Sequence, residues 1–285
     1  MEFPIPRNRL LRFFFLMVKR YLRHRVGVQS AALAFYLLFT IFPFLIFISA
    51  LLGMLQLDVT EILLALGEFL PREVVEIIGV YLSYVQGNSN TKLLIFGLVF
   101  SIYFPMRATN SLMRSVRTAY HLGPPPGAVA HILKTLLYTV LLIVTIALTL
   151  VLMTGSDRLL QYAVLYFHMP VFVAELWAAL RFPIIGVIGY FALFFLYAFS
   201  QDMRQPWRNI WPGTLAALAG WLTLSSLYTF YVERIAHYSV LYGSIGTVIV
   251  LLIWLNMSAV VLIMGAEMNG TLAGLRKDAA DIRIN

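Results

Sequence analysis

The sequence predicts an all-α fold, a polytopic transmembrane bundle of six spanning helices with interfacial amphipathic helices beside it. Of the 285 residues, 61% are hydrophobic and only 12% are charged, whereas soluble domains average ~45–50% apolar and ~25% charged residues. The charged residues also lie almost entirely in the gaps between long apolar runs. Such a distribution is typical of a chain that crosses a bilayer several times.

The spanning helices follow from the length of the apolar runs. A helix that crosses ~30 Å of hydrocarbon needs about 20 apolar residues. Within a single membrane domain, residues 1–285, the runs predict spans at 26–55, 93–117, 132–155, 180–201, 210–232 and 242–270. These runs lack the period-two alternation of a transmembrane barrel. A further run, 159–174, is shorter, and we expect it to be interfacial or re-entrant.

Two amphipathic segments lie outside the spans. Residues 1–25 predict a basic interfacial helix, with five basic residues on one arc of the helical wheel: Arg9, Arg12, Lys19, Arg20 and Arg23. It is expected to lie in the headgroup plane and attract anionic lipid; the alternative is a docking site for RNA or an acidic partner. Residues 56–92 predict an external amphipathic segment, which packs over the helix ends or rests on lipid, or else forms a lid.

The orientation follows from the basic residues. Sixteen of the 21 Lys and Arg residues lie in the terminal segments and in alternate gaps on the same side. The positive-inside bias therefore predicts that both termini are cytoplasmic. The first apolar run is too long for a signal-peptide core, so we expect no cleavable signal peptide.

The second span carries the candidate site. Only 14 uncharged residues, about 21 Å of helix, separate Lys92 from Arg107. Beyond Pro105, four polar residues recur at intervals of three and four and share one helical face: Arg107, Asn110, Arg114 and Arg117. This face is either an inward-facing site for the phosphate or carboxylate of a substrate, or a helix end whose arginines reach the headgroups.

Glu267 completes the candidate anion or lipid site. It lies near the end of the last span among small residues, which permit close approach of another helix. We expect it to pair with Arg107 or Arg114, or else to be solvated at the interface. Membrane lipids, in particular anionic ones, are the expected partners, and a homo-oligomer is a further expectation.

Several stretches carry a resemblance to a known family. They are Gln29-Ser30-Ala31-Ala32-Leu33-Ala34-Phe35-Tyr36 before Phe42-Pro43, Tyr242-Gly243-Ser244-Ile245-Gly246-Thr247 before Trp254, Gly265-Ala266-Glu267-Met268-Asn269, and Arg204, Pro206 and Trp207 before Pro212-Gly213. Over about residues 25–272 the chain resembles the YihY/BrkB family of bacterial inner-membrane proteins. The resemblance implies a six-helix membrane protein without an established activity, whose members were once labelled ribonuclease BN or virulence factor.

The residues themselves do not favour a nuclease. Metal-dependent hydrolysis needs clustered carboxylates and histidines, but the acids on the expected cytoplasmic side are sparse, the five histidines lack ligand spacing, and the chain has no cysteine. We therefore expect no enzyme, no catalytic residues, no metal site, no cofactor and no nucleic-acid partner. The expected function is that of a transporter or a lipid- or amphiphile-translocating protein of the inner membrane; the alternative is a non-transporting membrane scaffold.

Overall fold

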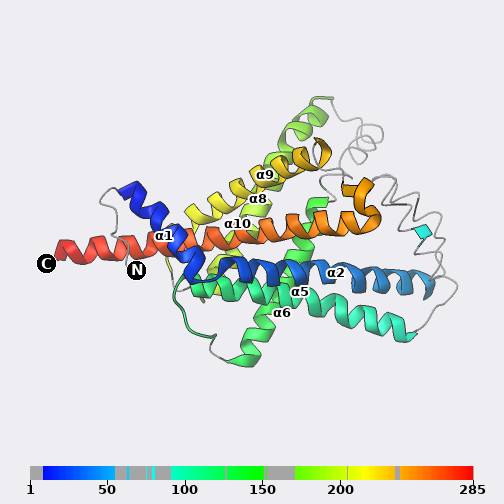
Figure 1. The fold of residues 1–285 in the computed structure, drawn as a ribbon, viewed down its shortest axis with the longest axis horizontal. Helices are drawn as coiled ribbons and strands as arrows, with labels where there is room; N and C mark the ends of the chain where they lie inside the picture. The colour runs from blue at the N-terminus through cyan, green and yellow to red at the C-terminus, as the bar shows by residue number, and fades with distance from the viewer. Residues whose placement is uncertain are drawn as a thin grey trace. The chain divides into compact units, whose positions relative to one another are not determined.

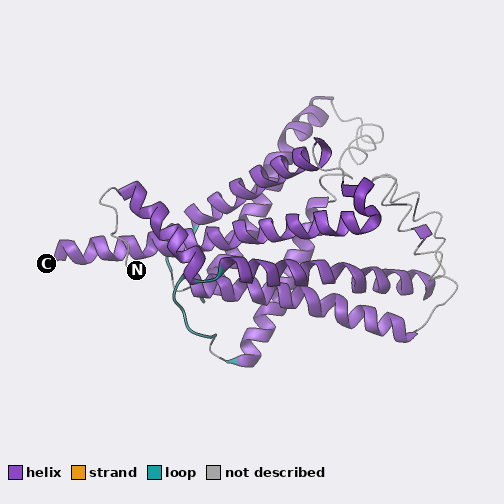
Figure 2. Ribbon diagram, viewed as in Figure 1, coloured by secondary structure: helices purple, strands orange, loops and turns teal. Residues whose placement is uncertain are grey.

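The computed structural model describes residues 9–54, 91–125, 127–150, 171–203, 205–234 and 238–284, together with positions 63, 75, 79–80 and 152. The expected external segment 56–92 and the run 159–174 therefore lie largely outside the described residues. Every regular element in the described part is a helix, as Figure 2 shows. The predicted all-α class is confirmed.

The longer helices run from α1 to α10 in chain order, as the colours of Figure 1 show. They are α1 (Arg9–Arg23), α2 (Val26–Met54), α5 (Thr91–Ala119), α6 (Ala128–Leu150), α8 (Val171–Ser200), α9 (Trp211–Arg234) and α10 (Tyr238–Ile284), with a short 3-10 turn η2 (Trp207–Asn209) before α9. Among the described residues, six helical segments are long and apolar enough to cross a membrane: Val26–Phe47, Thr91–Ala119, Ala128–Thr149, Ala179–Ser200, Trp207–Val232 and Val248–Leu275. The predicted bundle of six spans is thus confirmed by length and composition.

The chain forms two compact units that divide the helices between them. The first unit, which contains all the candidate residues, comprises residues 1–36, 107–145 and 186–285, and the second comprises residues 37–106 and 146–185. In the second unit α2 and α5 approach closely, because Gly97 has no side chain and lies against the backbone of Phe47. Aromatic rings, such as those of Phe39 and Phe104 with centroids 5.8 Å apart, fill the space on the other turns.

In the first unit, α9 and α10 form an antiparallel pair joined by reciprocal hydrogen bonds. Trp221 of α9 donates to Ser258 of α10 at 3.1 Å, and Trp254 of α10 donates to Ser225 of α9 at 3.3 Å. Nearer the end of the pair, Gly213 lies directly against the carbonyl group of Gly265. Small residues at such a crossing let two membrane helices pack with their backbones in contact.

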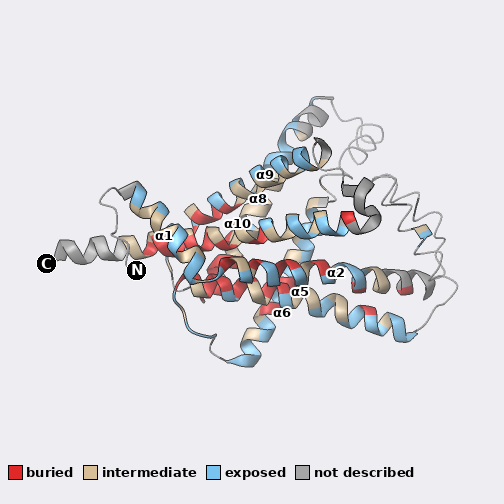
Figure 3. Ribbon diagram, viewed as in Figure 1, coloured by how far each residue is buried: buried red, intermediate tan, exposed pale blue. Residues whose placement is uncertain are grey.

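Buried residues gather in the second half of α5 and the second half of α10, which Figure 3 shows in red. Much of the remaining helix surface is exposed and apolar, as expected for helices that face lipid. The buried set includes polar residues, among them Arg117, Gln201, Glu267 and Asn269. The polar chemistry of the first unit therefore lies at the end of the bundle where α1 meets α10.

Candidate functional site

The predicted polar face of α5 exists, but its four residues have different surroundings. α5 continues without a break through Pro105, so the intervals of three and four residues hold from Arg107 to Arg117. Arg107 and Arg114 are exposed, Asn110 is half-buried, and Arg117 is buried. An outside ligand can therefore reach Arg107 and Arg114 but not Arg117.

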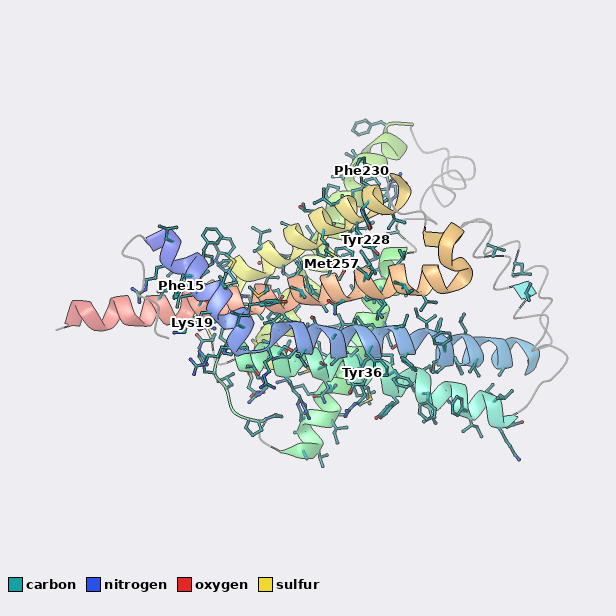
Figure 4. All side chains as sticks on the ribbon, viewed as in Figure 1. Phe15, Lys19, Tyr36, Tyr228, Phe230 and Met257 are labelled. Carbon is teal, nitrogen blue, oxygen red and sulfur yellow. The ribbon has the colours of Figure 1, made fainter. Side chains whose placement is uncertain are left out.

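Of these four residues, Arg107 lies farthest from the end of α5. It precedes Arg117 by ten residues, which corresponds to about 15 Å of α-helix. Its Nη2 donates a hydrogen bond to the Tyr36 hydroxyl at 3.2 Å, and its guanidinium lies over the same ring, 5.4 Å from the centroid. Figure 4 labels Tyr36 on α2, beside α5. The Tyr36 ring thus orients this guanidinium by a cation–π contact as well as by a hydrogen bond.

Asn110 joins α5 to α6. Its Oδ1 lies 2.8 Å from Nε2 of His131 on α6. A carbonyl oxygen can only accept a hydrogen bond, so Nε2 of His131 carries the hydrogen. Three basic residues, Arg114, Arg117 and Lys134, and one acidic residue, Asp202, interact electrostatically with this histidine, so the α5–α6 junction carries a net positive charge.

Arg114 stands apart from the other arginines of this face. It is exposed on the α5 surface one turn before Arg117. In the described parts of the chain, it makes no salt bridge with a carboxylate. A positive charge of this kind can bind an external anion without first giving up an internal partner.

Arg117 forms a structural clamp. Its Nη1 donates to the Ser200 carbonyl at 3.0 Å and to Asp202 Oδ2 at 2.7 Å, and its Nε and Nη2 donate to the Gly123 carbonyl. Lys134 binds the other oxygen of Asp202 at 2.6 Å. The clamp therefore joins the end of α5, the loop after it, α6 and the end of α8.

The Asp202 carboxylate is held in its ionised form. Partial burial would raise the pKa of Asp202, but the hydrogen bonds and charges of Lys134 and Arg117 outweigh it and lower that pKa. Asp202 also has a positive φ of 56°, in the left-handed region that ends α8. The charge of Arg117 is thus already compensated inside the protein.

Glu267 does not have the partner expected from the sequence. It is 1% exposed, so the expectation of a solvated interfacial carboxylate is wrong. Its Oε2 accepts from Arg20 at 3.1 Å, and its Oε1 lies 2.5 Å from His24 Nδ1. The expected pairing with Arg107 or Arg114 is therefore replaced by a pairing with two residues of the N-terminal helix region.

Arg20 is the centre of a second clamp. Its Nη1 also donates to the carbonyl of Ala119, in the last turn of α5, at 2.8 Å. Gly270 of α10 makes this geometry possible, because any side chain there would collide with the Ala119 carbonyl and approach Arg20. The Arg20 clamp therefore ties α1, α5 and α10 together at one point.

His121 lies at the edge of the Arg20 clamp. Its Nε2 is 3.3 Å from Arg20 Nη2, and its ring centroid is 5.5 Å from that of His24 in an edge-to-face arrangement. Arginine has only donors, so Nε2 of His121 must be the acceptor and the ring must be neutral in this arrangement. Burial and then the positive charge of Arg20 lower the pKa of His121, in agreement with that geometry.

The sequence interpretation missed Arg20, His24, His121 and Asp202. Arg20 and His24 are four residues apart, and His24 N donates to Arg20 O in the turn that follows α1, so both side chains reach Glu267. The helical wheel placed Arg20 on the basic arc that was expected to contact lipid headgroups. A single sequence does not identify which basic residue of such an arc contacts another helix instead. No group of three metal-ligating side chains occurs in the described ranges. The exposed arginines of the α5 face, Arg107 and Arg114, can bind an anion electrostatically.

Comparisons with known proteins agree with this architecture. The family profile described as "Virulence factor BrkB" matches residues 17–283. The chain belongs to the BrkB virulence factor family. The BrkB-family chain is 28% identical over 261 residues to YfkH of Bacillus subtilis (strain 168), a protein whose name calls it ribonuclease-like, and the match covers 92% of this chain and 95% of YfkH.

Shorter matches connect the BrkB-family chain to proteins named UPF0761 membrane protein. One from Verminephrobacter eiseniae (strain EF01-2) is 30% identical over 132 residues, 46% of this chain and 29% of the relative. One from Alkalilimnicola ehrlichii (strain ATCC BAA-1101 / DSM 17681 / MLHE-1) is 37% identical over 82 residues, 29% of this chain and 18% of the relative. No solved structure matches the chain. The family membership and the helices together identify a multi-pass membrane protein.

The Arg20 clamp yields a prediction on stability. Replacing Glu267 with Gln, or Arg20 with Gln, should lower the free energy of unfolding by about 3–5 kcal/mol, because each change leaves a buried charge without its partner. The measurement is equilibrium unfolding in mixed micelles. Arg23→Gln is the matched control, since Arg23 lies three residues along α1, is exposed, and should change stability by less than about 0.5 kcal/mol. Equal effects of Arg20→Gln and Arg23→Gln would contradict the clamp.

His121 yields a prediction on pH. Its folded-state pKa is lowered below the unfolded value of 6.5, so its contribution to stability is present above that value and is lost as the pH falls through the folded pKa. The wild-type Tm should therefore decrease as the pH falls below 6.5, and His121→Gln, which cannot be protonated, should reduce this decrease. The stabilising contribution of Asp202 is present throughout this range and is lost only at lower pH, because its pKa lies below 3.8. A wild-type and variant Tm with the same pH dependence would exclude this role of His121.

Proposed function

We propose that this membrane protein binds the phosphate-bearing headgroup of an anionic amphiphile, foremost a membrane lipid, on the α5 face formed by Arg107, Asn110 and Arg114, and translocates it across the bacterial inner membrane. The observation that supports this proposal is the exposed Arg114, which has no salt bridge among the described residues. Guanidinium groups bind phosphate bidentately, which gives both energy and orientation. The proposed ligand therefore supplies a negative charge to Arg114.

The position of Arg107 along α5 is the second observation that supports the proposed function. Arg107 is exposed and lies about 15 Å along α5 from the Arg117 clamp, roughly half of the hydrocarbon thickness. A charged side chain at such a depth costs at least about 2.5 kcal/mol on insertion scales. Two arginines at different depths on one exposed face offer successive positions for a phosphate that leaves the headgroup layer.

Arg117 and Glu267 are not part of the proposed ligand site. Their charges are compensated by Asp202 and by Arg20 with His24, respectively. Binding of an outside anion to Arg117 would require breaking a buried ion pair, which is strongly unfavourable. We therefore assign both residues to the positioning of helices around the site.

The competing function is that of a non-transporting scaffold, in which the α5 arginines only reach headgroup phosphates and fix the helix in the bilayer. We propose no hydrolytic activity for this chain. Phosphodiester cleavage with metals needs clustered acids or histidines, and the described ranges contain no such cluster. The ribonuclease-like wording belongs to the name of the relative YfkH.

The proposed site predicts lipid selectivity. Arg114→Gln and Arg107→Gln should each weaken binding of phosphatidylglycerol to the purified protein by roughly 10–100-fold, since a hydrogen bond to a charged group contributes about 1.5–3 kcal/mol. Native mass spectrometry measures the effect. Binding of phosphatidylcholine should change less, because its quaternary ammonium group offsets the phosphate charge.

Arg208→Gln is the control for the lipid experiment, since Arg208 is also exposed but belongs to η2, before α9, and not to the α5 face. A second measurement separates transport from scaffolding. In proteoliposomes, the wild type should accelerate the exchange of fluorescent phosphatidylglycerol between leaflets, and Arg107→Gln should slow it. Lipid binding without accelerated exchange between leaflets would support the scaffold. Equal binding of phosphatidylglycerol by Arg114→Gln and Arg208→Gln would exclude the proposed site.

We further propose that both termini are cytoplasmic, because most basic residues lie in the terminal segments and alternate gaps on that side. Reporter fusions after residues 88 and 285 should then report opposite compartments, with the fusion at residue 285 cytoplasmic. Both fusions in one compartment would contradict six spans with this orientation.

A further inference from the structure

The N-terminal helix α1 presents three different surfaces. One surface faces α10 through Arg20, whose guanidinium binds Glu267, and through Met17, whose sulfur accepts a hydrogen bond from Thr271. A second is basic and exposed at Lys19 and Arg23. The third is an exposed apolar stripe made of Leu11, Phe14, Val18 and Leu22, which are 58%, 65%, 61% and 69% exposed.

The apolar stripe is continuous along the helix. Its residues are separated by three, four and four positions, so they lie on one side of α1 over its whole length. Four large apolar side chains that are all more than half exposed form a patch of the kind that marks a membrane or protein contact. In the first unit, α10 packs on α1. It leaves the side of α1 that carries the apolar stripe uncovered.

The position of α1 indicates which occupant covers the stripe. α1 ends at Arg23 and the first span begins at Val26, so α1 lies where that span enters the bilayer. The turn between them is closed by hydrogen bonds from His24 N to Arg20 O and from Arg25 N to Leu22 O, with Arg25 at a φ of 51°. Since the Arg20 clamp holds the other side of α1 against α10, the helix cannot move far from the membrane boundary.

Charge indicates the composition of that membrane. Lys19 and Arg23 are exposed on α1, Arg25 is exposed in the turn after it, and α1 has no acidic residue. An apolar side with a basic flank is the pattern of helices that lie in the interface of an anionic bilayer.

We infer that α1 docks on an anionic lipid surface, with Leu11, Phe14, Val18 and Leu22 in the headgroup–acyl boundary and Lys19 and Arg23 at the lipid phosphates. Figure 4 shows the α1 side chains, with Lys19 labelled. This surface is separate from the α5 face, because it consists of other residues on another helix. It would anchor the protein to anionic membranes whether or not the α5 face carries a lipid across.

The absence of cysteine from the sequence makes the test direct, because any introduced cysteine is a unique labelling position. Phe14→Cys, Val18→Cys and Lys19→Cys, each carrying a nitroxide, are reconstituted as full-length protein in phosphatidylcholine nanodiscs with and without phosphatidylglycerol. In the anionic discs, the labels at 14 and 18 should be relaxed more by oxygen than by a water-soluble nickel chelate. The label at 19 should show the reverse preference, although it is the next residue in the chain.

The contribution of charge is tested separately. The double change Lys19→Gln and Arg23→Gln, placed in the Val18→Cys background, should reduce the lipid-facing preference in anionic discs, with roughly fivefold weaker surface association per basic residue removed. Arg208→Gln in the same background is the matched control and should leave the preference unchanged.

Two results would overturn the inference. Nickel accessibility at positions 14 and 18 equal to that at position 19 would mean that the stripe faces water, as a site for a soluble partner or a second copy would. Lipid contact that is identical in zwitterionic and anionic discs, and insensitive to the double change, would mean that the basic flank does not select anionic lipid. A Tm for each labelled protein close to that of the wild type establishes that α1 remains folded.

Discussion

The structure depends on arginines that bind the last carbonyl groups of neighbouring helices. The final carbonyls of a helix have no intrahelical partner and carry the negative end of the helix dipole. Arg20 binds the Ala119 carbonyl at the end of α5, and Arg117 binds the Ser200 carbonyl at the end of α8. Each guanidinium is also neutralised by a carboxylate, from Glu267 and Asp202 respectively. Two similar clamps thus connect α1, α5, α6, α8 and α10 at one end of the first unit.

The two clamps distinguish charged residues that hold helices together from charged residues that can bind a ligand. A guanidinium that already binds a carbonyl and a carboxylate fixes the angle between helices, and its removal would leave a buried partner unsatisfied. Arg114 lies on the same helix face as Arg117 but is exposed and has no such carboxylate in the described ranges. The proposed ligand chemistry follows from this difference in surroundings, because both residues have the same side chain. The clamps hold the helices while the exposed Arg114 remains available to an anion.

The sequence predicts the fold well because bilayer-spanning helices obey a simple requirement. Every backbone polar group in hydrocarbon must be paired within its own element, so an apolar run of sufficient length becomes a helix, as Val26–Phe47 and Val248–Leu275 illustrate. The polar face of α5 was predictable for the same reason, since helical periodicity fixes which residues share a side. The partner of Glu267 was not, because it lies 247 positions away in Arg20. Periodicity describes one helix at a time and gives no information on which neighbour it meets.

The long separation between Arg20 and Glu267 has a consequence for biosynthesis. Bacterial chains grow at about 5–20 residues per second, so Glu267 leaves the ribosome roughly 12–50 s after Arg20. During that interval the first helix cannot form its clamp, since neither the carboxylate nor the surface of α10 yet exists. Completion of the bundle is therefore tied to the last helix made, and a chain truncated before Glu267 would insert its early spans without locking α1 against the end of α5.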